Sequence, residues 1–219
     1  MNENKTTAVV FSNSPKARNT SVTIDINGKT ITTAKTAKFL GLTFDQQLTW
    51  NPHISNVVNK TKSKINLLRS ITGQRWGANK TTLLRIYRTL IRPKMEYGFE
   101  LFLTASKSTL NKLVTLQNTC LCICTGAMMS TATDILYNEC GELPLHLRIK
   151  TSLAKYSSKL ATSTNNPAKE ILHDTWHNHY GKFVAGKESI YTHIQKYHQD
   201  GNTAPITVTH KPPWNRKKN

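Results

Sequence analysis

The chain has 219 residues, of which 37% are hydrophobic, and its thirty lysines and arginines against twelve aspartates and glutamates give a net charge of +18. The apolar content is sufficient for a core, which excludes a wholly disordered protein. No run of about 18 apolar residues is present to span a membrane, and the polar start of the chain predicts no secretory signal. With this charge, nucleic acid is the leading expected partner, ahead of an acidic membrane surface or an acidic protein.

The first part of the chain is expected to form β structure. Residues 7–11 are rich in β-forming side chains. The dipeptide Asn27-Gly28 lies between two runs that alternate apolar and polar residues, which is the strongest short-range signal of a hairpin. Residues 39–44 are expected to form one further strand, in which Gly41 marks a bulge or a close approach of another backbone.

The middle of the chain, residues 50–160, is expected to be helical. Asn51 should cap a first helix that has Pro52 at its first position. Asn79 should cap a second helix, which Pro93 kinks or stops. The apolar residues expected to face inward recur at helical spacing, and they are Ile54, Val57, Val58, Ile65 and Leu68 in the first helix and Leu83, Ile86, Tyr87 and Leu90 in the second.

Three further helices follow in this prediction. One covers residues 110–124 and ends at Gly126, a short one covers residues 134–139, and the last runs from Pro144 to about residue 160. Cysteines are confined to this part of the chain, at positions 120, 122, 124 and 140. Their spacing fits neither metal ligation nor easy pairing, so we expect reduced core thiols in an intracellular protein, nuclear or cytoplasmic.

Positive charge is concentrated between Gln46 and Lys94, a window that contains no Asp or Glu. Such a window favours a polyanion as neighbour over a merely solvated basic face. Its ten cationic residues are Lys60, Lys62, Lys64, Arg69, Arg75, Lys80, Arg85, Arg88, Arg92 and Lys94.

Three of these cations form a stripe on the second helix. Arg85, Arg88 and Arg92 lie roughly 4–6 Å apart along the helix axis, close to the spacing of successive phosphates on one nucleic-acid strand. We expect no acidic side chain one turn away to relieve their mutual repulsion. The stripe is therefore predicted to contact phosphates, with a solvated face as the alternative.

No constellation for catalysis or metal binding is evident. The sequence has no nucleophile elbow, no phosphate-binding loop and no dinucleotide-binding glycine pattern. Asp25 and Asp45 could approach each other on neighbouring strands, but nothing marks them as a metal pair. His173 and His177 are one helical turn apart without the supporting ligands that zinc needs, so a surface cluster is the better interpretation.

Several short motifs occur in order between Lys5 and about Leu160. They are Lys5-Thr6 with Val9-Val10-Phe11, then Lys38-Phe39-Leu40-Gly41-Leu42, Leu48-Thr49-Trp50 with His53, Ile86-Tyr87 with Met95-Glu96-Tyr97-Gly98, Leu116-Gln117-Asn118 with Thr125-Gly126-Ala127, and Gly141 with Pro144-Leu145. This ordered set resembles the region after the catalytic hairpin in reverse transcriptases of non-LTR retrotransposons, the jockey-like group in particular.

The resemblance implies roles for individual residues. Lys5 would match a lysine that helps pyrophosphate leave during nucleotide addition. Phe39, Leu40 and Gly41 would form the primer grip, which sets the 3′ end of the primer. The basic helices would follow the backbone of the template–primer duplex, an RNA–DNA hybrid or other duplex, without reading its sequence, through Lys60, Lys64, Arg85, Arg88 and Arg92.

The sequence also departs from this family. The polymerases hold two magnesium ions with aspartates on earlier strands, including a Tyr-x-Asp-Asp hairpin, and no such hairpin occurs here. We therefore predict that this chain alone is inactive as a polymerase. We expect no metal site and no cofactor in it, with magnesium implied only for the full-length enzyme, and we name the upstream polymerase domains as a further candidate partner.

The predicted fold is α+β. Residues 1–45 are interpreted as a small antiparallel palm remnant, residues 46–162 as a mainly helical, thumb-like bundle, and residues 163–219 as a basic, poorly ordered tail. The favoured hypothesis is a reverse-transcriptase fragment that holds a nucleic-acid duplex. The alternatives are a stand-alone basic helical module, derived from such an element, that binds nucleic acid or a protein, and a chain without a function.

Overall fold

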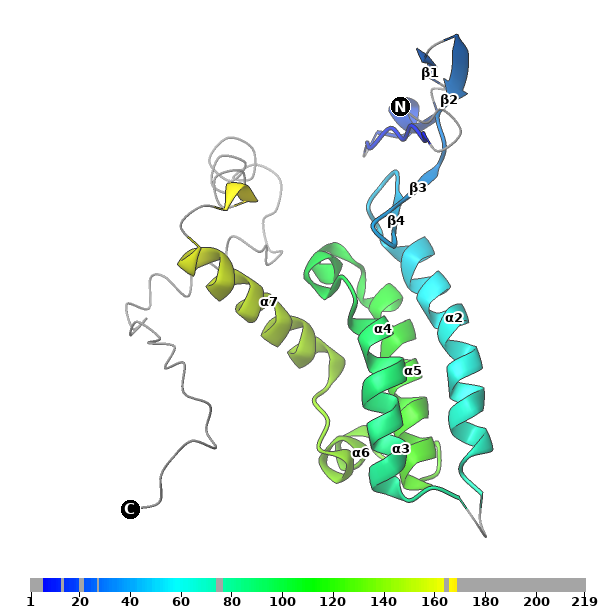
Figure 1. Cartoon of the computed structure of the whole chain (residues 1–219), viewed down its shortest axis with the longest axis vertical. Helices are drawn as coiled ribbons and strands as arrows, with labels where there is room; N and C mark the ends of the chain where they lie inside the picture. The colour runs from blue at the N-terminus through cyan, green and yellow to red at the C-terminus, as the bar shows by residue number, and fades with distance from the viewer. Residues whose placement is uncertain are drawn as a thin grey trace. The chain divides into compact units, whose positions relative to one another are not determined.

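The computed structural model describes residues 6–12, 14–19, 22–26, 28–73, 77–163 and 166–168. Two small antiparallel sheets precede a series of helices (Figure 1), so the predicted α+β fold class is confirmed. The chain divides into two compact units, residues 1–152 and residues 153–219. Lys5, the histidine cluster around His173 and most of the predicted tail lie outside the described residues.

The first hairpin follows the sequence prediction. Strand β1 (Thr23–Ile26) pairs antiparallel with β2 (Lys29–Thr32), and Gly28 in the turn has a φ of 80°. Residues 7–11, although rich in β-forming side chains, form no strand, and Ala8 makes an isolated parallel bridge to Thr33. A short helix that the sequence did not predict, α1 (Pro15–Asn19), follows it.

The expected single strand at residues 39–44 is instead the tip of a second hairpin. Strand β3 (Thr36–Phe39) pairs antiparallel with β4 (Leu42–Asp45), and Phe39 is opposite Leu42. The chain reverses at Leu40 and Gly41 because both residues have positive φ angles. A turn at this point breaks the extended backbone that one strand would need.

Helix α2 (Asn51–Ser70) begins where the sequence predicts, but its cap differs. Trp50 is the N-cap residue, in a left-handed conformation, and no side chain caps the helix. The Asn51 side chain instead accepts a hydrogen bond of 2.6 Å from the ammonium group of Lys112. The predicted inward face is confirmed, since Ile54, Ile65 and Leu68 are buried and their two valine neighbours pack on the core.

The second predicted helix is continuous through Pro93, by means of a π-helical turn. Helix α3 (Lys80–Ile86) is capped by Asn79, whose side chain accepts from the N–H of Thr82 as predicted. The π-helix η2 (Tyr87–Ile91) and helix α4 (Arg92–Glu96) follow directly. Proline has no N–H, and in a regular α-helix its ring clashes with the carbonyl group one turn back. The wider π-helical turn before Pro93 accommodates it. Leu90, expected to face inward, is exposed.

The remaining elements agree closely with the sequence pattern. A 3₁₀ helix, η3 (Phe99–Thr104), leads into α5 (Lys107–Thr125), which ends at Gly126. Helix α6 (Thr133–Cys140) ends at Gly141, and α7 (Leu145–Thr162) crosses the boundary between the two units. All four cysteines are buried free thiols, as predicted, and burial raises the pKa of Cys120 to about 12.

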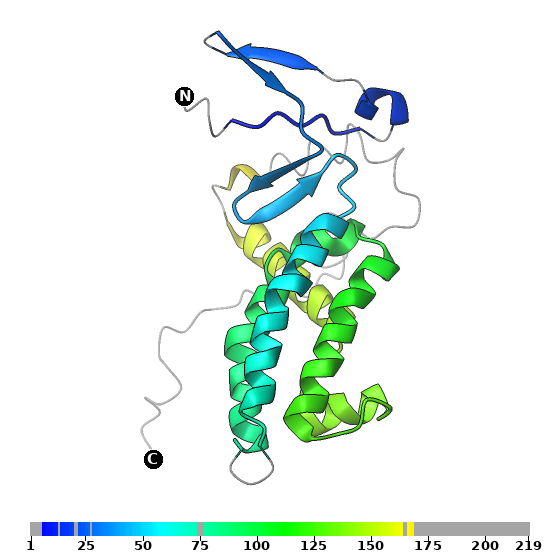
Figure 2. The same ribbon diagram turned by 90° about the vertical axis from the view of Figure 1, so that its right-hand side faces the viewer.

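One apolar core in the first unit joins the helices. Helices α2, α5 and the α3–α4 segment run alongside one another (Figures 1 and 2). The largest fully buried side chains include Ile54, Leu68, Tyr87, Ile91, Met95, Phe99, Phe102, Leu113 and Leu121. Among the described residues of the two hairpins, Leu42 is the one apolar residue that is buried. The hairpins therefore contribute little to this core.

Candidate nucleic-acid interface

The tip of the β3–β4 hairpin is strained and exposed. Leu40 has a φ of 47° and Gly41 a φ of 82°, the combination that defines a two-residue type I′ turn. A leucine in the left-handed region costs roughly 1–2 kcal/mol, where Asn or Gly is the usual choice. Phe39 is 64% exposed and Leu40 is 72% exposed. The three predicted primer-grip residues therefore form one apolar, solvent-facing tip.

Tyr97, at the end of the α3–α4 segment, holds this tip in place. Its hydroxyl group donates a hydrogen bond of 2.6 Å to the carbonyl oxygen of Leu40. Its ring lies against Gly41, where an added Cβ would be 3.5 Å from Cε1 of the tyrosine. At Gly98 (φ 80°) an added Cβ would be 2.8 Å from Cδ2 of Leu42, which explains a glycine there. The hairpin and the Tyr97–Gly98 corner therefore fit closely together.

The other end of the hairpin is tied to α2 by Asp45. Its carboxylate accepts hydrogen bonds from the N–H groups of Thr49 and Trp50, both 3.0 Å long, and from the Thr49 hydroxyl group at 2.8 Å. Trp50 has a φ of 62°, is buried, and meets the ring of Phe44 edge-on at 5.3 Å between centroids. Asp45 thus orders the backbone before α2.

A pocket of about 220 Å³ lies between the hairpin tip, α2 and α4. Gly41 and Tyr97 line it from the side of the tip, and Lys60 and Lys94 contribute the two cationic side chains. The remaining lining residues are His53, Asn56, Val57 and Thr61. No carboxylate lies among these eight residues, so the pocket carries uncompensated positive charge.

His53 forms part of the wall and is held as the neutral imidazole. Its side chain is 3% exposed, and Nδ1 accepts a hydrogen bond of 3.2 Å from the N–H of Thr43. Burial lowers the pKa of His53, and the positive charge of Lys60 lowers it further. Because Nδ1 is the acceptor, the single proton of the neutral ring must be on Nε2.

The structure brings some of the predicted binding residues together and separates others. Gly41 and Lys60 line the same pocket, with Phe39 and Leu40 at the adjoining tip. Lys64 lies one turn further along α2 and is half-buried. Lys94 and Tyr97 complete the pocket. Lys94 is one of the ten cations of the acid-free window and Tyr97 belongs to one of the ordered motifs, but neither residue was predicted to belong to a site.

The expectation that no acidic side chain lies one turn away from the arginine stripe is wrong for Arg92, and an acid from a distant part of the sequence also neutralises Arg88 and Arg92. Arg88 forms an ion pair with Glu142 at 2.6 Å, and Arg92 forms one with the same carboxylate at 3.3 Å. Arg92 also pairs with Glu96, four residues later, at 3.4 Å. The Glu142 side chain is only 1% exposed. Two predicted phosphate ligands are therefore engaged by an internal acid.

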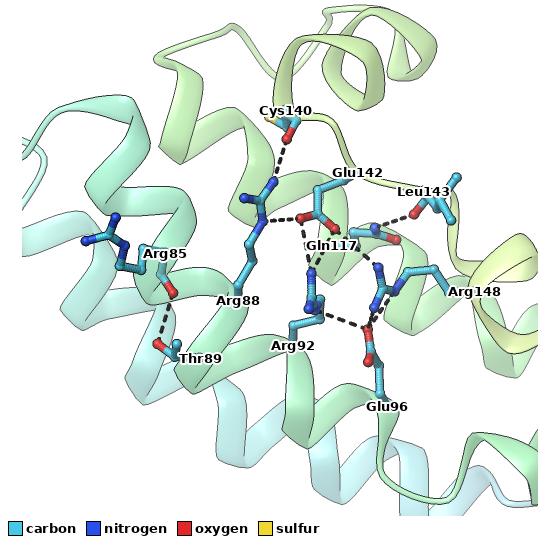
Figure 3. A network of polar contacts seen from close by, with 10 residues as sticks. All are labelled: Arg85, Arg88, Thr89, Arg92, Glu96, Gln117, Cys140, Glu142, Leu143 and Arg148. Atoms are coloured by element: carbon cyan, nitrogen blue, oxygen red, sulfur yellow. Dashed lines mark hydrogen bonds and ion pairs between the residues drawn. The ribbon is translucent and has the colours of Figure 1, made fainter. Parts of the chain in front are cut away.

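These contacts belong to a larger network, which Figure 3 shows. Arg148, at the start of α7, pairs with Glu96 and, at 3.5 Å, with Glu142. Arg88 also donates to the carbonyl oxygen of Cys140 at 2.9 Å. Three arginines and two glutamates leave a net charge of +1, so most of this positive charge is neutralised locally. Arg85 is exposed, and its guanidinium group points away from the network in the same view.

Two further kinds of feature are absent from the described residues. Within them, no group of three or more His, Cys, Asp or Glu side chains is arranged to hold a metal ion. In the same ranges, no helix combines the length and apolar character that crossing a lipid bilayer requires.

Comparison with known proteins identifies the homologues of this chain as RNA-directed DNA polymerases of non-LTR retrotransposons, so the resemblance seen in the sequence is confirmed. The chain is 26% identical over 148 residues to the RNA-directed DNA polymerase from mobile element jockey of Drosophila melanogaster. It is 22% identical over 149 residues to the probable RNA-directed DNA polymerase from transposon BS of the same species. A third relative, the probable RNA-directed DNA polymerase from transposon X-element of Drosophila melanogaster, is 21% identical over 135 residues.

The matches cover most of this chain and little of its relatives. The aligned part is 68% of the chain for the first two relatives and 62% for the third. It is 16% of the jockey and BS proteins and 15% of the X-element protein. No protein-family model matches the chain, and no solved structure matches it.

Proposed function

We propose that this chain is the segment of a retrotransposon reverse transcriptase that holds the template–primer duplex by its backbone. The homologues support a reverse-transcriptase segment. The observation that carries the duplex contact is the convergence of the exposed Phe39–Leu40 tip, Lys60 and Lys94 around one pocket without a carboxylate. Ammonium groups bind phosphate oxygens without reading bases, so the contact is not sequence-specific.

The arrangement of the elements supports this contact. The hairpin tip is fixed at both ends, by Tyr97 at the turn and by Asp45 at the start of α2. A strained, exposed turn that its surroundings hold in place is a common property of functional sites. The cationic residues Lys60 and Lys64 then continue along α2, which contains no acidic residue.

The arginine stripe has a smaller part in this proposal than the sequence suggested. Arg85 is the exposed member and is kept as a phosphate ligand. Arg88 and Arg92 are proposed to fix the α3–α4 segment to Glu142, and any contact that they make with phosphate is additional to that role.

Catalysis is not part of the proposed role of these residues. Phosphoryl transfer by this family depends on magnesium held by aspartates. Asp45, which lies within the described residues, accepts hydrogen bonds from backbone N–H groups instead. With primer, template, deoxynucleotides and magnesium, we expect the purified chain to give no extension product. Extension by the clean protein would contradict this part of the proposal.

The test of the proposed function is equilibrium binding to a short RNA–DNA hybrid, followed by fluorescence anisotropy. We expect the full chain to bind the hybrid more tightly than a single strand of the same length. We also expect two hybrids of unrelated sequence to bind equally well. Equal affinity for the single strand, or a marked preference for one sequence, would contradict the proposal.

A further inference from the structure

The pocket beneath the hairpin tip has the chemistry of a phosphate site. Lys60 reaches it from α2 and Lys94 from α4, and both lysines are otherwise exposed. In the described part of the chain, neither lysine forms an ion pair with an acidic side chain. Two positively charged side chains that line one pocket repel each other, and an anion bound between them would relieve that repulsion.

The two acidic residues that lie between pocket-lining residues in the sequence are already engaged. Glu96, two residues after Lys94, is paired with Arg92 and Arg148. Asp45 accepts hydrogen bonds from backbone groups at the start of α2. Neither carboxylate lines the pocket. The charge of the two lysines is therefore available for a ligand.

The volume of the pocket and its other lining residues limit which ligands it can hold. Pockets for drug-sized molecules or cofactors are typically about 300–1,000 Å³, and this one is about 220 Å³. It fits a phosphate group with part of its sugar. Asn56 offers amide N–H donors, while Val57 and the ring of Tyr97 provide an apolar surface for a sugar. The exposed apolar tip of Phe39 and Leu40 adjoins this wall.

We propose that this pocket seats a single phosphate group between Lys60 and Lys94, with Asn56 as an additional donor. The inference rests on the proposed function, in which the phosphate belongs to the strand that passes the hairpin tip. A free nucleotide offers the same chemistry, and the experiment separates the two sources. Lys94 and Asn56 are ligands that the sequence analysis did not assign to a site.

The first measurement uses charge-matched variants of the full chain. Lys60→Gln with Lys94→Gln removes the two pocket cations, and Lys62→Gln with Lys107→Gln removes two exposed lysines that do not line the pocket. Each pair is titrated with the RNA–DNA hybrid over a range of salt concentrations. We expect the pocket pair to flatten the plot of log K against log salt by about 0.9, the value for one lost phosphate contact, and the control pair to change it by much less. Equal effects of the two pairs would overturn the inference.

The second measurement uses the imidazole of His53 as a reporter in the pocket wall. Burial and, secondly, the charge of Lys60 lower its pKa, so an anion beside Lys60 should raise that pKa, which NMR titration can follow. We expect an increase on saturation with the hybrid. An increase with deoxynucleoside monophosphate or inorganic phosphate alone assigns the site to free phosphate, and an increase only with the hybrid assigns it to a strand phosphodiester. An equal increase with polyglutamate would overturn a phosphate site in favour of an acidic protein.

The failures of the two proposals can be told apart. If the hybrid binds but the pKa of His53 does not change and the pocket pair behaves like the control pair, only the pocket inference is overturned. If the wild-type chain does not bind the hybrid at low salt, the proposed function fails, and the strand contact inferred for the pocket fails with it.

Discussion

The hydroxyl group of Tyr97 donates a hydrogen bond of 2.6 Å to the carbonyl oxygen of Leu40, fifty-seven residues earlier in the chain. This bond fixes an exposed, strained turn to the residue that follows helix α4. Leu40 belongs to the motif that resembles the primer grip, and Tyr97 belongs to a motif that resembles part of the thumb. The contact therefore joins two segments of the chain that the sequence resemblance identified as separate motifs.

Removing this bond should loosen the hairpin tip. We expect Tyr97→Phe to lower the free energy of unfolding by about 0.5–1.5 kcal/mol, the usual net value of one hydrogen bond. Affinity for the RNA–DNA hybrid should fall severalfold as the tip loses its fixed position. Chemical denaturation and anisotropy measure the two effects, with Tyr156→Phe in α7 as the control. An unchanged affinity would show that the position of the tip does not matter for binding.

The strain at Leu40 predicts opposite effects on stability and binding. Leu40→Asn places a residue in the turn that tolerates a positive φ, so the variant should be more stable by about 1 kcal/mol. The same change removes an exposed apolar side chain from the tip, so hybrid binding should weaken. Thermal unfolding and anisotropy on the same preparations test this pair of effects. A variant that is more stable and binds equally well would remove Leu40 from the interface.

The Glu142 network should be important for folding. Glu142→Gln would leave Arg88, Arg92 and Arg148 without their shared buried carboxylate. Loss of one partner from a buried ion pair costs about 3–5 kcal/mol, and because the Arg88 and Arg92 side chains are 41% and 27% exposed we expect about 2–3 kcal/mol here. Glu139→Gln breaks the exposed pair with Lys80 and is the matched control, with little change expected. Similar losses from both variants in urea denaturation would contradict the structural role of the network.

Burial of His53 predicts that stability depends on pH. Its pKa is lowered in the folded protein, first by burial and then by Lys60, so the unfolded chain binds a proton more readily. The resulting stabilisation is fully present above the ordinary histidine pKa of about 6.5 and is lost as the pH falls below it. In His53→Gln, whose amide oxygen can still accept the Thr43 N–H, the decrease in stability between pH 6.5 and 5 should be smaller. Equal pH profiles for the two proteins would show that His53 is not the group responsible.

Local features of the fold were predictable because their causes are local. The side chain of Asn79 bonds three residues ahead, Gly126 takes the left-handed conformation that ends α5, and Ile54, Ile65 and Leu68 recur at helical spacing. The turn at Leu40 was missed because leucine rarely adopts a positive φ, so the run of residues 39–44 resembled one strand. The Asn51 cap failed because Asp45 orders the backbone before α2.

The candidate site was less predictable, since its partners are distant in sequence. Arg92 bonds to Glu142, fifty residues away, and no helical pattern indicates such a pair. Its pair with Glu96 is only one helical turn away, and the sequence analysis missed it although the spacing of the two residues indicates it. Lys60 and Lys94 share a pocket only because α2 and α4 pack together, so the sequence could count both charges without placing them side by side.

The salt dependence of hybrid binding tests the central claim most directly. For the wild-type chain and an RNA–DNA hybrid, the account predicts that log K falls linearly and steeply with log salt, with several phosphates contacted, and that a single strand binds more weakly throughout. Affinity that is indifferent to salt, or no detectable binding at low ionic strength, would contradict it.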